Sequence, residues 1–179
     1  MTLTSILPTL RRSIPSPHSR DMWPARTVVT CDDIVVGGIS VNRFVELCGL
    51  PAVMTAPAVI PVSGGMSSST ATTTVLLLRV MAAGGVDGGT ALAVDADLVA
   101  AAYAVWSEAR LLARVSSAHD HRFAVCGADG ERLPGVAVVL PADTGCGDVI
   151  AVPCPGALSV GDVRPHPTLA KGLNAGGVE

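Results

Sequence analysis

The strongest hydrophobic pattern in the chain lies between residues 70 and 83. Small residues and threonines lead into a continuous apolar run that stops at Gly84-Gly85. Apolar runs of this length that end at glycine are typical of helices. Residues 95–114 show a second apolar stripe with a spacing of three or four residues, preceded by Asp95 or Asp97 as an N-cap. The pattern therefore predicts two successive helices.

Short β-branched runs on both sides of these helices predict strands. Residues 26–31 and 34–41 read as a hairpin, with a bulge or bend at Gly37-Gly38. Residues 43–48 form a predicted helical turn ending at Gly49. Prolines within residues 52–62 indicate an edge strand or partly a loop. The remaining predicted strands are 123–126 and 136–140, which would form a hairpin, and 149–152.

The order strands, helix, helix, strands predicts an α+β fold. We expect a mixed or mainly antiparallel sheet with the helices packed on one of its faces. Residues 25–155 would form this domain. Residues 1–24 would be a flexible N-terminal arm or a targeting segment, and residues 156–179 a Pro/Gly-rich tail.

The composition argues against two classes of binding partner, nucleic acids and membranes. The chain has 179 residues, a net charge of −3, an apolar share of 49% and only 3% aromatic residues, so Val, Leu and Ala must build its core. The single lysine and the lack of a basic stripe argue against nucleic-acid binding. No apolar run reaches the ~18 residues that span a bilayer, so no membrane partner is expected.

The cysteines and the composition of the N-terminus indicate in which cellular compartment the protein is expected. The five cysteines match no zinc or thioredoxin spacing, which favours buried free thiols in a reducing, cytoplasmic setting. The first twenty residues contain arginines, serines and prolines but no acid before Asp21. That composition resembles an organelle transit peptide, so an organellar location is the alternative.

The candidate chemistry lies between the predicted edge strand and the first predicted helix. Gly64 and Gly65 would make a tight turn, and Ser67, Ser68 and Ser69 would begin the helix. A helix N-terminus presents unpaired N–H groups and favours an anion such as phosphate. The alternative is an ordinary serine-capped helix after a glycine turn.

Residues 61–71, Pro-Val-Ser-Gly-Gly-Met-Ser-Ser-Ser-Thr-Ala, resemble the second motif of the GHMP small-molecule kinases, and the galactokinase branch most of all. Residues 102–127 resemble the segment of that branch that carries an acidic residue facing the phosphate acceptor. Asp120 matches it, although histidines 119 and 121 replace the usual Met and Gln. A surface turn or a metal site are the other interpretations of this His-Asp-His string.

The resemblance implies a GHMP-type N-terminal domain and an ATP-dependent kinase that phosphorylates a sugar or another small-metabolite hydroxyl. It implies ATP at Gly64 to Ser69, Mg²⁺ at Ser68 and Glu108, and Asp120 as the catalytic group that accepts the hydroxyl proton. It covers residues 59–127, and the family's first and third motifs are not convincingly present.

Several alternatives accompany this partial match. The chain could act as a homo-oligomer, or a C-terminal domain could be missing. It could also be a non-catalytic α+β binding or assembly domain with a decayed kinase motif, or an unrelated structural protein. The kinase hypothesis predicts that a helix begins within residues 67–71, and a continuous strand across residues 66–72 would contradict it.

Overall fold

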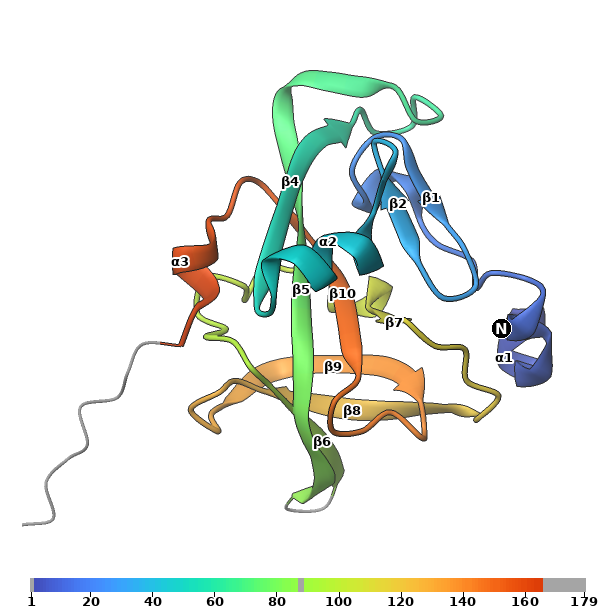
Figure 1. The fold of residues 1–179 in the computed structure, drawn as a ribbon, viewed down its shortest axis with the longest axis vertical. Coiled ribbons are helices and arrows are strands. Elements are labelled where there is room, and N and C mark those ends of the chain that lie inside the picture. Colours follow the sequence, from blue (N-terminus) through green and yellow to red (C-terminus); the bar gives the residue numbers. More distant parts are fainter. Residues whose placement is uncertain (1, 87–88, 166–179) are drawn as a thin grey trace, which may run out of the picture.

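The computed structural model describes residues 2–86 and 89–165. The chain is α+β, with much sheet and few, short helices (Figure 1). The helical elements are α1 (Leu3–Ile6), η1 (Pro8–Arg12), η2 (Arg20–Met22), α2 (Val41–Cys48), η3 (Trp106–Glu108) and α3 (Val160–Val163). The strands are β1 (Thr27–Val29), β2 (Ile34–Val36), β3 (Ile39–Ser40), β4 (Ala52–Val59), β5 (Ser67–Val86), β6 (Gly89–Val94), β7 (Arg110–Leu112), β8 (Asp120–Cys126), β9 (Arg132–Pro141) and β10 (Val149–Pro155).

The strands form two sheets. A small sheet has the order β1-β2-β3, and a seven-stranded sheet has the order β7-β10-β5-β6-β8-β9 with β4 also paired to β5. The large sheet is mixed, because β6 and β8 run parallel whereas β5 pairs antiparallel with β4, β6 and β10. Figure 1 shows β5 running through the whole molecule, with β4 beside its first half and β6 beside its end.

The predicted helix at residues 70–83 is wrong, because this segment belongs to the long strand β5. The middle of β5, residues 73–78, is buried on both faces. Leu76 and Leu78 belong to the larger core, whereas Val75 and Leu77 belong to a second core that also holds Trp23. A strand covered on both sides carries a continuous apolar run, which periodicity alone cannot distinguish from a buried helix.

The predicted helix at residues 95–114 is also wrong. The structure has an irregular segment there, followed by η3 and β7. Leu98 and Ala101 of the predicted apolar stripe are nevertheless in the larger core, and Leu112 is in the second core. Backbone N–H groups of this segment bond to distant chain segments instead of to a helical turn: Asp97 N donates to Val163 O at 2.9 Å, and Val105 N to Pro153 O at 2.7 Å. The expected pair of helices on one sheet face is therefore absent from the described residues.

Other local predictions are confirmed. The β1–β2 and β8–β9 hairpins form, β10 contains the predicted 149–152 strand, and α2 ends before Gly49. Strand β4 lies at an edge: its outer side is met at one end by a bridge from Pro24 to Ala58. The glycine pair at 37–38 makes a turn between β2 and β3 instead of a bulge, and both glycines have positive φ.

The structure describes most of the predicted N-terminal arm but only part of the predicted C-terminal tail. From residue 3 to residue 22 the N-terminal segment forms α1, η1 and η2 and hydrogen-bonds to the body of the domain. Of the predicted 156–179 tail, residues 166–179 lie outside the described residues, and α3 lies before them. Among the helices that are described, none has the length and apolarity needed to cross a bilayer.

Candidate functional site

The glycine turn predicted before the serines is confirmed, but the helix after it is not. Gly64 and Gly65 have φ values of +75° and +111°. Ser67 then pairs with Val59 across the β4–β5 hairpin, so its backbone belongs to a strand ladder. The Ser68 hydroxyl accepts hydrogen bonds from the N–H groups two and three residues later, at 3.2 and 3.0 Å. With Ser69 in the same strand, these serines do not surround a helix N-terminus.

Asp120 and Glu108, the predicted catalytic and metal-binding carboxylates, both hold the N-terminal segment. Asp120 accepts hydrogen bonds from Ser5 Oγ at 2.9 Å and from the Arg11 guanidinium. Glu108 accepts from Trp23 Nε1 at 3.1 Å and from the Ser19 N–H at 3.2 Å. Both carboxylates therefore have structural partners.

The structure does not bring the predicted kinase residues together. The serines lie at the start of β5, at the top of Figure 1, whereas Asp120 begins β8 in the lower part. Among the described residues, no group of three or more His, Cys, Asp or Glu side chains is arranged to hold a metal ion. The Ser68 and Glu108 pair and the strand backbone at Ser67 do not fit the expected Mg²⁺ and ATP phosphates.

A cavity of about 230 Å³ lies elsewhere, under the N-terminal segment. Its walls come from residues 2–17, the β1–β2 turn, residues 107–116, Asp120 at the start of β8 and the end of β9, and they include the carboxylates of Asp33, Glu108 and Asp120. Three arginines reach it from different elements: Arg11 from η1, Arg110 from β7 and Arg114 from the loop that follows β7.

Two of these arginines have acidic partners. Arg11 pairs with Asp120 and also donates to the Ala118 carbonyl at 2.9 Å. Arg114 pairs with Asp148 through two parallel bonds, from Nε at 2.7 Å and from Nη2 at 2.6 Å.

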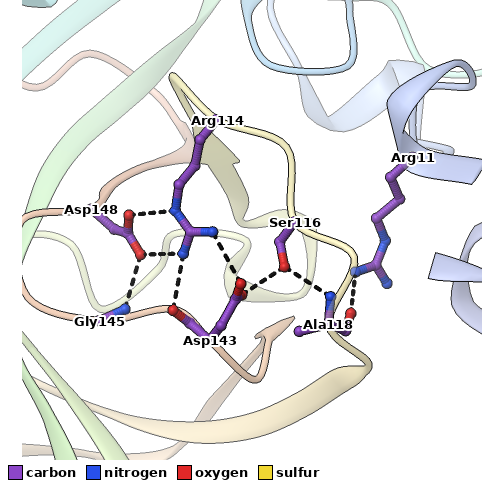
Figure 2. Close-up of polar contacts among 7 residues, drawn as sticks. All are labelled: Arg11, Arg114, Ser116, Ala118, Asp143, Gly145 and Asp148. Atoms are coloured by element: carbon purple, nitrogen blue, oxygen red, sulfur yellow. Dashed lines mark hydrogen bonds and ion pairs between the residues drawn. The ribbon is translucent and has the colours of Figure 1, made fainter. Parts of the chain in front are cut away.

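The Arg114 contacts extend into a network that joins two loops (Figure 2). Arg114 also donates to Asp143 Oδ2 at 3.2 Å, and Ser116 Oγ donates to Asp143 Oδ1 at 2.6 Å. Burial alone would raise the pKa of Asp143 and Asp148, but the bonds from Ser116, Arg114 and the Gly145 N–H outweigh it and lower both pKa values. The bonds of Arg114 to Asp148 and Asp143 raise the pKa of Arg114. This network is a structural clamp beside the cavity.

Arg110 differs from the other two arginines. Its Nη atoms donate to the backbone carbonyls of Ser16, at 2.9 Å, and of Pro17. Its Nε is buried without a hydrogen-bond partner, and no carboxylate of the described residues lies within ion-pair distance. Burial lowers the pKa of Arg110, although Glu108 opposes the change. Burial and then Arg110 lower the pKa of His18.

Sequence reasoning did not find this cavity. Arg11 and Arg110 are separated by almost the whole domain in sequence, and neither belongs to a recognisable motif. The available signal was the pair of arginines at the end of the predicted 95–114 helix, Arg110 and Arg114. No family model matches the chain, and no curated protein shows significant sequence similarity to it.

Proposed function

We propose that this protein is a non-catalytic binding domain that holds a small anion in the cavity beneath its N-terminal segment. The observation that carries the proposal is Arg110, a cation in the cavity wall with no carboxylate of the described residues within ion-pair distance, although Glu108 lies close enough to raise its pKa. A charge removed from water costs free energy unless an opposite charge offsets it. An anionic ligand would supply that charge, as two carboxylates do for Arg114.

The cavity limits the ligand's size. Pockets for drug-sized molecules usually measure about 300–1,000 Å³, and this cavity measures about 230 Å³. The chemistry therefore favours a compact anion that carries phosphate or carboxylate groups. Arg110 would provide the charge, and the neighbouring Ser107 and Thr30 would provide hydroxyl groups.

Ligand-induced thermal stabilisation tests this proposal. Inorganic phosphate and citrate should raise the melting temperature more than chloride at matched ionic strength, because a ligand that binds only the folded state stabilises it. Arg110→Gln should abolish this difference. Arg132→Gln is the matched control, because Arg132 is exposed at the start of β9 and does not line the cavity. A difference retained in Arg110→Gln, or absent from the wild type, would refute the proposal.

The kinase hypothesis is not our conclusion, because strand β5 replaces the helix on which it depended. The proposed function retains the alternative from the sequence, a binding domain without catalysis. The GHMP resemblance itself remains an expectation.

A further inference from the structure

The N-terminal segment has an unusual distribution of polar and apolar side chains. Its buried residues are Thr4, Pro8 and Arg11. Its large aliphatic residues point to solvent: the exposed fractions are 67% for Leu3, 55% for Ile6, 53% for Leu7 and 46% for Ile14. The segment therefore attaches through polar contacts and turns its apolar side away from the domain.

We call the four exposed aliphatic residues of this segment, Leu3, Ile6, Leu7 and Ile14, the N-terminal stripe. Leu3 and Ile6 belong to α1, Leu7 follows α1, and Ile14 follows η1, so the stripe runs along two short helical turns and not along one continuous helix. The half-buried Leu10 fills the interval between Leu7 and Ile14. Figure 1 shows α1 at the outer flank of the molecule, where the stripe can meet a large partner.

Residues 2–20 themselves carry charges of one sign only. Residues 2–20 contain three arginines and no acid. Arg11 forms an ion pair with Asp120, whereas Arg12 and Arg20 are exposed. The carboxylates that contact this segment, Asp120 and Glu108, belong to the body of the domain. A segment with exposed aliphatic residues, exposed arginines and no acid of its own has the composition of segments that lie in a lipid interface.

We propose that the N-terminal stripe docks this protein on the surface of an anionic lipid bilayer, with its aliphatic side chains in the acyl boundary and Arg12 at the headgroups. The small area of the N-terminal stripe favours a bilayer over a second copy of this chain as its partner. A stable dimer buries about 800 Å² on each partner, which four partly exposed side chains do not supply. The sequence prediction of no membrane partner rested on the lack of a spanning run, and a segment that lies on the surface needs no such run. The inference is independent of the anion in the cavity.

Vesicle co-sedimentation of the full chain tests the inference. Vesicles of phosphatidylcholine with phosphatidylserine should bind the wild type, and vesicles of phosphatidylcholine alone should bind it more weakly. The double variant Leu3→Gln/Ile6→Gln should lose about tenfold or more in binding, because polar groups replace aliphatic burial. Arg12→Gln should weaken binding and reduce its sensitivity to salt.

The matched control is Leu47→Gln/Val99→Gln, since both side chains are highly exposed, at 71% and 83%, outside the stripe. This control should bind vesicles like the wild type. The inference is overturned if the wild type does not bind phosphatidylserine vesicles at low salt, or if the stripe variant and the control bind equally. A concentration-dependent dimer that the stripe variant abolishes, without vesicle binding, would assign the stripe to a second copy and also overturn it.

Discussion

Val62 has an unfavourable backbone conformation for its residue type. It lies in the turn between β4 and β5 with φ +62°, and its side chain is 93% exposed. A β-branched residue in the left-handed region is strained, and this side chain contributes almost no packing in return. Its N–H donates to Asp21 Oδ2 at 3.0 Å, a contact that belongs to the backbone.

Val62→Asn should therefore raise the free energy of unfolding by about 1 kcal/mol, because asparagine tolerates the left-handed region. Urea denaturation measures the change. Val99→Asn is the control, since Val99 is also exposed but does not have positive φ, and it should change stability by less than about 0.5 kcal/mol. Equal effects of both substitutions would contradict the strain at Val62.

Among the elements, charged contacts of Arg114 link the loop that follows β7 to the loop between β9 and β10. Arg114→Gln should lower the free energy of unfolding at pH 7 by about 1 kcal/mol. Two bonds to Asp148 are lost, but Arg114 is 35% exposed and water screens the pair. The exposed pair of Arg43 and Glu46 serves as control, and Arg43→Gln should cost less than about 0.5 kcal/mol.

The effect of Arg114→Gln should depend on pH. The folded-state pKa values of Asp143 and Asp148 are lowered, so their contribution is present above the unfolded pKa of about 3.9 and is lost as the pH falls through the folded values. The stability difference between wild type and variant should therefore shrink below about pH 4. Urea melts from pH 7 to pH 3 measure it, and a constant difference would contradict the role of the carboxylates.

Element prediction succeeded where local chemistry determines the backbone. Gly49 with φ +73° ends α2, and Pro57 lies in a strand at the sheet edge, as their residue types predict. It failed in β5, where Leu76 and Leu77 enter different cores. Only the tertiary arrangement shows that both faces of this run are covered, and the preceding threonines were the available signal for a strand.

At the scale of the whole molecule, the catalytic hypothesis required a helix N-terminus and an acid side by side. Mg-ATP should therefore leave the melting temperature unchanged relative to magnesium chloride with an equivalent nonbinding salt. The physical reason is that Ser67 pairs with Val59 in a strand ladder, and Asp120 pairs with Arg11. Differential scanning fluorimetry gives the comparison. A saturable ATP-dependent stabilisation would restore nucleotide binding as a candidate function.

The candidate site could not have been derived from the sequence, because long-range folding assembles it. The N-terminal segment contributes Arg11, and β7 contributes Arg110. The acid-free composition of the first twenty residues was visible, but it predicted a flexible or targeting segment. That Glu108 and Asp120 hold this segment depends on contacts more than eighty residues apart in sequence.

Strand β5 has a consequence for how this chain can change in length during evolution. Alternate residues of β5 enter opposite cores, and the same strand pairs with β4, β10 and β6. One codon inserted or deleted near Leu76 would exchange the two faces for every residue beyond it and shift its pairing with β10 and β6. Strand β5 therefore tolerates a substitution far better than a change of one residue in length. The turn at Gly64, in contrast, can absorb such a change in length.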